Sequence, residues 1–364
     1  MNTLIPEHEI EPEALQQIYN WLNLSFLKKL AIMPDVHTGY SLPIGGVALL
    51  NGVISPVAVG YDIGCGMISV DLKTKVSEII PAREDQEKIY KDITNIIPLG
   101  FNIFQSPKFK IGYFVPSIST KDSKRLKEEV DKKLGKSLGT LGGGNHFIEL
   151  GSNREGNLCV TIHSGSRNPG HQIGRFYMNL AKDTELPNGF FALESELGQA
   201  YYQDMNYMLW YALQNRRRIL EQVLNILGFK WQSDFINENH NHAVITEDGI
   251  LHRKGATPAK KDQLGVIPGN MRDGVYITKG LGNTKYLCSA SHGAGRKGSR
   301  KWAKNTFNVE SFRDSMGDVI GRFDEGTLDE CPQAYKDFDT VVKYQEGVVV
   351  EIIDYIKPII NVKG

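Results

Sequence analysis

The hydrophobic pattern predicts four amphipathic helices in the first two thirds of the chain. Apolar residues recur at helical spacing in residues 12–29, 84–97, 121–134 and 196–227. The second and third of these stretches are rich in charge and are expected to expose one face to solvent. A further long helix is expected near the end of the chain, running through Asp354.

Between the helices, the pattern changes to short apolar runs separated by Gly and Pro, which is typical of strands and tight loops. Residues 31–56, 140–150, 158–162 and 234–244 follow it. We therefore expect an α+β fold with a β-rich centre whose loops carry the functional residues and whose outside is covered by helices. No internal repeat or low-complexity linker divides the sequence, so residues 1–364 are predicted to form a single domain.

Composition narrows the class of protein. The chain has 42 Lys and Arg against 42 Asp and Glu, so any contact with nucleic acid must come from local patches and not from net charge. Four scattered cysteines cannot build a disulfide framework, and the first residues lack the features of a secretory signal. No apolar run approaches the ~20 residues of a membrane helix. A cytoplasmic protein with no membrane partner is expected.

The stretch AVGYDIGCGMISV, residues 58–70, contains the sharpest chemical signal. Asp62 and Cys65 lie three residues apart in a glycine-rich turn, which lets both side chains point at one ion. A carboxylate together with a thiolate suits a borderline divalent metal such as Mn, Zn or Fe. Read alone, the same turn is more often a buried Cys capped by an Asp. Upstream, Asp35 and His37 are either further ligands or polar braces of their own loop.

Several histidines stand where predicted strands begin or end. His146 follows a glycine run, His163 closes the strand 158–162, and His240 and His242 share one face if residues 234–244 form a strand, although only one of them need bind metal. A single strand-end histidine is more often structural than ligating. Two or more combined with Asp62 and Cys65 favour a metal centre.

Basic residues form two clusters. Arg216, Arg217 and Arg218 are expected on a solvated helix face, with contact to a nucleic-acid backbone as the alternative. In CSASHGAGRKGSRKWAK, His292 is followed by Arg296 and Arg300, which are expected on one face of a helix and are suited to phosphate. The alternative is a surface basic helix preceded by a loop histidine.

Taken together, these segments resemble the RtcB family of RNA-splicing ligases over nearly the whole chain. The motifs are MPDVHTG, DIGCGM, GGGNHFIE, HSGSR, HN, RKGAT, HGAGR, AYKD and the terminal KG, at residues 33–39, 62–67, 142–149, 163–167, 240–241, 253–257, 292–296, 334–337 and 363–364.

The resemblance implies a GTP- and manganese-dependent ligase that joins RNA ends carrying a 3′-phosphate or 2′,3′-cyclic phosphate to a 5′-hydroxyl, in RNA repair or tRNA splicing. It implies that His292 is the guanylylated histidine and that two Mn²⁺ ions share Cys65. The metal ligands would be Asp62, Cys65, His146, His163 and His240. Contacts to the guanine nucleotide would come from Asn145, Glu149, Asn241, Asn270, Tyr335 and Lys363. Phosphate or RNA would be bound by Arg167, Arg296 and Arg300.

Two positions depart from the family pattern, Pro258 after RKGAT and Asn270 after the IPG turn. We therefore expect that the affinity for the nucleotide or the preference for the RNA end differs from that of other family members. Two other functions stay open from the sequence. A metal-dependent RNA-end phosphodiesterase would use the metal ligands without His292. A non-catalytic guanine-nucleotide or RNA-binding module would need neither Asp62 nor Cys65.

Overall fold

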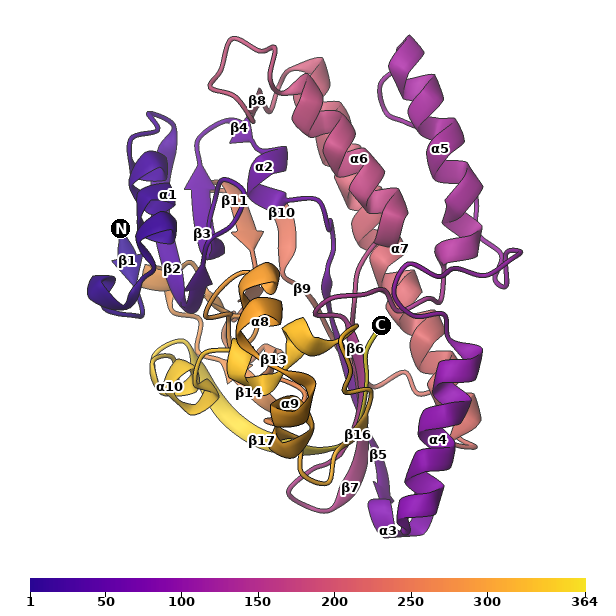
Figure 1. Ribbon diagram of the computed structural model, residues 1–364. Coiled ribbons are helices and arrows are strands. Elements are labelled where there is room, and N and C mark those ends of the chain that lie inside the picture. The colour runs from indigo at the N-terminus through magenta and orange to yellow at the C-terminus, as the bar shows by residue number, and fades with distance from the viewer.

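A computed structural model describes all residues, 1–364, and shows strands in the middle with helices around them (Figure 1). This confirms the predicted α+β fold with a β-rich centre. None of the helices combines the length and the apolar character that crossing a membrane requires.

The larger sheet runs in the order β13-β14-β17-β6-β7-β5-β9, and every neighbouring pair in it is antiparallel. The end strands β9 and β13 lie against each other, so the sheet nearly closes on itself. A short strand, β16, runs parallel to β17. The strands are β5 Gly66–Lys75, β6 Phe147–Ser152, β7 Asn157–Ser164, β9 Ile236–Asn239, β13 Leu264–Pro268, β14 Val275–Gly280, β16 Ile320–Gly321 and β17 Val350–Val362.

The second sheet has the order β1-β2-β3-β11-β10. Two small pairs, β4 with β8 and β12 with β15, complete the β structure. The bounds are β1 Asn2–Thr3, β2 Leu27–His37, β3 Ile44–Leu50, β10 Asn241–Thr246, β11 Gly249–Lys254, β4 Val53–Ile54, β8 Phe191–Ala192, β12 Ala256–Pro258 and β15 Ser289–Ser291.

Three predicted helices form close to their expected bounds, as α4 Arg83–Ile96, α5 Lys121–Ser137 and α7 Glu196–Ile226. One face of α7 packs on the larger sheet through side chains such as Ile219 and Val223, each buried with a favourable transfer free energy of about 1.5–3 kcal/mol. The remaining helices are α1 Pro12–Leu22, α2 Pro56–Val59, α3 Val76–Ile79, α6 Arg167–Leu180, α8 Arg300–Thr306, α9 Val309–Ser315 and α10 Phe338–Lys343.

The predicted helix 12–29 is too long. Helix α1 ends at Leu22, and the chain turns through Asn23 to enter β2 at Leu27. Phe26 and Leu30 fit a helical spacing, but residues 27–37 pair with β3 instead, and the buried second half of β2 lies in the core. Pairing with a neighbouring strand therefore outweighs the local helical pattern here.

The predicted long helix through Asp354 is wrong. Helix α10 ends at Lys343, Gly347 adopts a φ of 72°, and the chain then forms β17, which pairs with both β14 and β6. The apolar run from Val348 onward is rich in β-branched residues, which favour a strand, and contains Pro358, which disfavours a helix interior.

The prediction that Arg216 lies on a solvated face is also wrong. Its side chain is fully buried and donates hydrogen bonds to the carbonyl oxygens of Gly64 and Ser164 and to the side chains of Asn237 and Asn239. Burial lowers the pKa of Arg216 to about 10, although Cys65 and Asp62 raise it. The guanidinium thus ties α7 to the strands that carry the candidate metal ligands.

Candidate active site

A glycine-rich turn between α2 and β5 places Asp62 and Cys65. Gly60 and Gly64 have φ values of 93° and 72°, which side chains other than glycine rarely adopt. A Cβ on Gly64 would also lie 3.0 Å from the Cβ of Ala212 on α7. The turn therefore sits tightly on α7, with Cys65 directly before the first residue of β5.

Three histidines reach the same place from neighbouring strands. His163 is on β7, opposite Met67 of β5, and His146 directly precedes β6. His240 lies between β9 and β10, where the chain leaves the larger sheet for the smaller one, so residues 234–244 are not one continuous strand as expected. His242 points elsewhere and contacts Arg253.

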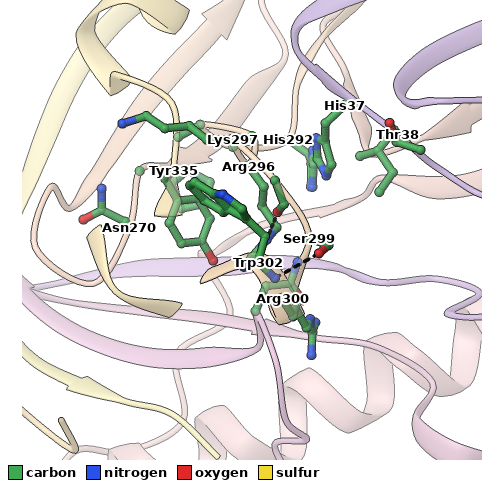
Figure 2. A pocket seen from close by; sticks show the side chains of 18 of the residues that line it. His37, Thr38, Asn270, His292, Arg296, Lys297, Ser299, Arg300, Trp302 and Tyr335 are labelled. Carbon is green, nitrogen blue, oxygen red and sulfur yellow. Dashed lines mark hydrogen bonds between the residues drawn. The ribbon is translucent and has the colours of Figure 1, made fainter. Parts of the chain in front are cut away.

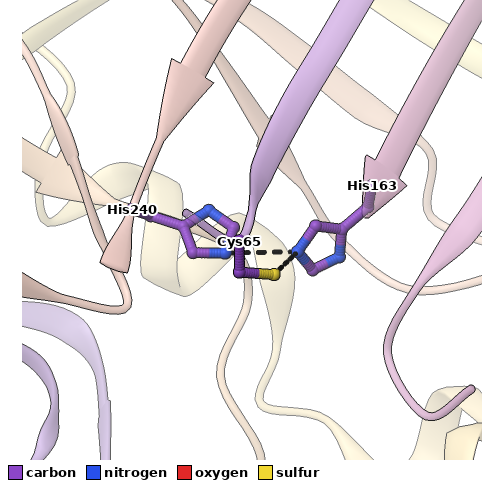
Figure 3. Close-up of side chains that lie close together, drawn as sticks. All are labelled: Cys65, His163 and His240. Atoms are coloured by element: carbon purple, nitrogen blue, oxygen red, sulfur yellow. Dashed lines mark hydrogen bonds between the residues drawn. The ribbon is translucent and has the colours of Figure 1, made fainter. Parts of the chain in front are cut away.

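The five side chains converge within hydrogen-bonding distance of one another. The Cys65 Sγ atom lies 3.1 Å from His163 Nε2 and 3.3 Å from His146 Nε2. His163 Nε2 is 3.2 Å from His240 Nε2, and His146 Nε2 is 3.0 Å from Asp62 Oδ2. Figure 3 shows Cys65, His163 and His240 facing one another across their strands.

These atoms form two possible metal-binding groups that share Cys65. One consists of Cys65, His163 and His240, and the other of Asp62, Cys65 and His146. Two imidazole nitrogens bound to one ion at 2.0–2.1 Å in tetrahedral geometry lie about 3.3 Å apart, close to the 3.2 Å observed between His163 and His240. The donor set therefore fits two borderline divalent ions with a bridging sulfur.

The surroundings hold the histidines in the form that metal binding requires. His146 Nδ1 lies 3.0 Å from the carbonyl oxygen of Leu141, and His163 Nδ1 lies 3.0 Å from that of Asn145, so both rings are fixed with Nε2 toward the other candidate donor atoms. Burial lowers the pKa of His163 and of His240 well below the ordinary value. Both imidazoles are thus neutral.

Burial opposes metal binding at the Cys65 thiol, because it favours the protonated form of the sulfur. It raises the pKa of Cys65 well above the ordinary value, and the neighbouring Asp62 raises it further. Burial also acts to raise the pKa of Asp62, but the hydrogen bond and charge of His146 outweigh it and the net shift is downward. A metal ion must therefore displace a proton from Cys65, as ordinary thiolate ligands require, but none from Asp62.

A cavity of about 760 Å³ adjoins this centre, a volume within the usual range for small-molecule sites. The cavity reaches His163, one of the candidate metal ligands, and the adjacent His292. Its aromatic lining residues are Phe147, Trp302 and Tyr335. Figure 2 shows His37, His292, Arg296, Asn270 and Tyr335 around one space. Of the predicted nucleotide contacts, the cavity lining contains Asn145, Asn270, Tyr335 and Lys363.

His292 follows β15 and is held from one side. Its Nδ1 atom lies 2.6 Å from Oδ2 of Asp35, a fully buried residue on β2, and its backbone N–H donates to the same oxygen at 3.1 Å. The ring centroid of His292 is 4.8 Å from that of His240. Nε2 is therefore the free nitrogen of a histidine that lines the cavity beside the metal ligands. Asp35 and His37 belong to neither metal-binding group: the Asp35 side chain braces His292, and His37 Nδ1 lies 2.8 Å from the Asp35 carbonyl oxygen within their own loop.

Glu330 was not singled out by the sequence, yet it joins three predicted site residues. Its buried carboxylate accepts hydrogen bonds from Lys363 Nζ at 2.7 Å, from Arg296 Nη1 at 3.2 Å and from the Tyr335 hydroxyl. Burial acts to raise the pKa of Glu330, but Lys363 and Arg296 lower it to about 2. The residue is a carboxylate in a mostly polar stretch, and no spacing in the sequence distinguishes it.

The arginines are arranged differently from the prediction. Helix α8 begins at Arg300, so Arg296 lies in the preceding loop and the two do not share a helix face. Arg296 pairs with Glu330, whereas Arg300 is half-exposed and lies next to Gly144. Arg167 donates to Thr140 Oγ1 and to the carbonyl oxygen of Gly100, beside the glycine run that leads to His146.

Two predicted nucleotide contacts lie outside the cavity lining. Glu149 is buried on β6 and accepts a hydrogen bond from Asn361 at 2.9 Å, and it is Asn361 that lines the cavity. Asn241 donates to the carbonyl oxygen of Asp62 and accepts from the Gly255 N–H, so it braces the metal-binding turn. The cavity thus takes in four of the six residues predicted to contact the nucleotide.

Comparison with known proteins settles the family. A family model described as tRNA-splicing ligase RtcB matches residues 17–364. The chain belongs to the RtcB family of RNA ligases. RNA-splicing ligase RtcB of Escherichia coli K12 is 34% identical over 394 residues, covering 98% of this chain and 95% of that protein.

Archaeal RtcB proteins are similar over comparable lengths. The tRNA-splicing ligase RtcB of Aeropyrum pernix is 30% identical over 448 residues, covering 97% of this chain and 92% of its own length. That of Methanococcus maripaludis is 28% identical over 450 residues, with coverage of 98% and 92%. The matched residues 17–364 include both candidate metal-binding groups, His292 and the terminal Lys363.

Proposed function

We propose that this RtcB ligase seals RNA ends that carry a 3′-phosphate or a 2′,3′-cyclic phosphate to ends that carry a 5′-hydroxyl, using GTP. The observation that carries the proposal is the position of His292, whose free Nε2 belongs to a side chain lining a nucleotide-sized cavity next to the metal ligands. A nucleophile, a nucleotide-sized space and a metal centre are then adjacent.

In the first step, His292 Nε2 attacks the α-phosphorus of GTP. A phosphorus–nitrogen bond forms, the bond to the bridging oxygen breaks, and pyrophosphate leaves. Asp35 keeps the proton on Nδ1 and so leaves the Nε2 lone pair available. The positive charge that develops on the imidazole lies next to the Asp35 carboxylate, which stabilises it.

In the next steps, an oxygen of the RNA 3′-phosphate attacks the phosphorus held by His292. The phosphorus–nitrogen bond breaks and the RNA now ends in a pyrophosphate link to GMP. The 5′-hydroxyl of the second strand then attacks the RNA 3′-phosphorus and GMP leaves. A cyclic end must first be opened by water to a 3′-phosphate. Activation by GMP is needed because a 3′-phosphate alone is a poor electrophile.

We assign the resident ions as two Mn²⁺ held by Asp62, Cys65, His146, His163 and His240. When bound, they neutralise negative charge on phosphoryl oxygens and so lower the barrier to each displacement. The support for this assignment is the five convergent donor atoms and the shared sulfur. The protein's own contribution is to fix the rings of His146 and His163 through the carbonyls of Leu141 and Asn145, while burial keeps His163 and His240 neutral.

We assign the guanine nucleotide to the 760 Å³ cavity, with its base among Trp302, Tyr335 and Phe147 and its phosphates toward His292. Arg296 and Lys363 supply positive charge, partly neutralised by Glu330. Asn145, Asn270 and Tyr335 offer hydrogen bonds from the lining. Glu149 acts through Asn361, and Asn241 acts through the turn that carries Asp62.

A ligation assay tests the proposal. One RNA carries a labelled 3′-phosphate or a labelled 2′,3′-cyclic phosphate and the other a 5′-hydroxyl, and the protein is supplied with Mn²⁺ and GTP together or with each left out. We expect a joined product that retains the labelled phosphate at the junction, only when both are present. Cleavage of the cyclic phosphate without joining, unaffected by His292→Ala, would instead identify a phosphodiesterase.

A further inference from the structure

Three aromatic rings follow one another at the edge of the metal centre. The rings of Tyr61 and His171 are stacked, with centroids 4.9 Å apart and planes inclined by 20°. The ring of Tyr40 meets Tyr61 edge-on at 5.9 Å. Tyr40 is 60% exposed, His171 is exposed and Tyr61 is half-buried. We call Tyr40, Tyr61 and His171 the aromatic ladder.

The backbone holds the ladder in place without a ligand. Gly174 of α6 packs so closely on the chain at Tyr61 that an added Cβ would lie 3.3 Å from Tyr61 Cα. His171 is three residues before Gly174 on the same helix, which brings its ring over Tyr61. The loop of Tyr40 is fixed by two hydrogen bonds between the side chain of Gln17 and the backbone of Gly39.

The ladder lies beside the metal ligands but outside the nucleotide cavity. Tyr61 directly precedes Asp62, and the Asp62 carboxylate is close enough to raise the pKa of His171, although burial and Arg175 lower it more. His37 and Thr38 line the cavity, whereas Tyr40, two residues further on, does not. A nucleotide in the cavity therefore leaves the three rings free.

Basic residues accompany the rings along α6. Arg167, His171 and Arg175 are spaced four residues apart, so they follow one stripe of the helix with about 6 Å between successive positions. Arg175 is exposed, and its only hydrogen bond is to Gln172 on its own helix. The stripe begins with Arg167 near the candidate metal ligands and leads outward to Arg175. The ring of His171 lies between these two positive charges.

We propose that the aromatic ladder binds the terminal bases of a single-stranded RNA end by stacking, with Arg175 on its backbone, and so delivers that end to the metals from the Asp62 side. This rests on the proposed RNA-ligase function. Exposed rings next to positive charge are the usual means of binding single strands without sequence preference, because every base has an aromatic face. An RNA ligase acting on many ends requires that tolerance.

Binding of fluorescent single-stranded RNA, measured by anisotropy on the Mn²⁺-loaded protein, tests the ladder. Tyr40→Ala and His171→Ala should each weaken RNA binding and raise the KM for RNA by about tenfold, with kcat largely retained. Tyr113→Ala is the matched control, because Tyr113 is 82% exposed and has no aromatic partner. GTP-dependent labelling of the protein should be unchanged in all three variants, since the rings lie outside the cavity.

RNAs whose terminal nucleotide lacks its base show whether stacking is responsible. One RNA lacks the base at its 3′-phosphate end and another lacks it at its 5′-hydroxyl end. At the end that the aromatic ladder holds, loss of the base should weaken RNA binding to wild type. The same loss should add little to the binding defect of Tyr40→Ala. Equal RNA affinity and KM in wild type, Tyr40→Ala and His171→Ala would overturn the proposal while the ligase function stands. Absence of ligation by wild type would instead overturn the proposed function.

Discussion

The carboxylate of Asp35 lies 2.6 Å from Nδ1 of His292 and also accepts the backbone N–H of His292 at 3.1 Å. One buried oxygen therefore fixes both the ring and the backbone of the proposed nucleophile. Because Asp35 comes from β2 and His292 follows β15, the contact also joins two distant parts of the chain at the cavity. It is the link between the MPDVHTG and HGAGR motifs.

Replacing Asp35 with Asn should slow formation of the GMP–protein adduct by roughly 100-fold, because an amide lacks the negative charge that stabilises the imidazole as it acquires the phosphoryl group. The rate of label transfer from GTP to protein measures this. Asp314→Asn, at an exposed position, is the control. Ligation of RNA already activated with GMP should persist in Asp35→Asn. An unchanged adduct rate would contradict the role assigned to Asp35.

Replacing Cys65 with Ser should abolish ligation through loss of metal, since a hydroxyl is a far poorer ligand for a borderline ion than a thiolate. Metal content after dialysis should fall for both ions, because Cys65 belongs to both groups. Cys159→Ser is the matched control, as Cys159 is buried on β7 outside the metal groups. Wild-type metal content in Cys65→Ser would rule out the bridging thiolate.

Four of the five side chains in the candidate metal-binding groups could be predicted from local signals in the sequence. Asp62 and Cys65 share a glycine-rich turn, and His146 and His163 stand at strand ends that alternation reveals. The pairing of Asp35 with His292 was not predictable, because 257 residues separate them and only strand order brings them together. The role of Glu330 was not predictable either, because its partners Arg296 and Lys363 come from other parts of the chain.

The fold, too, could be predicted from the sequence only in part. Helices α4, α5 and α7 follow from periodicity alone, since each has one clear apolar face. At both ends of the chain the local pattern is overridden by strand pairing, as β2 takes residues from a helical pattern and β17 replaces an expected helix. Such pairing depends on partners far along the chain, which a sequence window does not contain.

Glu330→Gln should lower the free energy of unfolding at neutral pH by about 3 kcal/mol, because it leaves the buried Lys363 and the partly buried Arg296 without a countercharge. It should weaken GTP binding as well, since both cations line the cavity. Denaturant unfolding and calorimetry measure the two effects. Glu325→Gln, at an exposed position nearby, should change neither. Wild-type stability in Glu330→Gln would show that the ion cluster contributes nothing.

Glu149 should make stability depend on pH. Burial raises its pKa to about 8, although the hydrogen bond from Asn361 and the charge of Lys363 lower it. Between the unfolded pKa near 4.5 and the folded pKa near 8, the native state holds a proton that the unfolded state has released, so stability falls as pH rises. Relative to Glu149→Gln, wild type should lose about 1.4 kcal/mol per pH unit in this window.

Denaturant unfolding of the metal-free protein at several pH values gives this difference directly. Because other titrating groups are common to both proteins, their contributions cancel in the comparison. A difference in stability that does not change between pH 5 and pH 8 would show that Glu149 is ionised in the native state.

The central claim is that His292 carries GMP during the reaction, and its most direct test is labelling with GTP that is radioactive at the α-phosphate. Protein incubated with this GTP and Mn²⁺ should acquire label that survives alkaline denaturation and is released by mild acid, as a phosphorus–nitrogen bond requires. His292→Ala should acquire none, yet should still ligate RNA already activated with GMP. Label retained by His292→Ala, or label lost in base but stable in acid, would contradict the account.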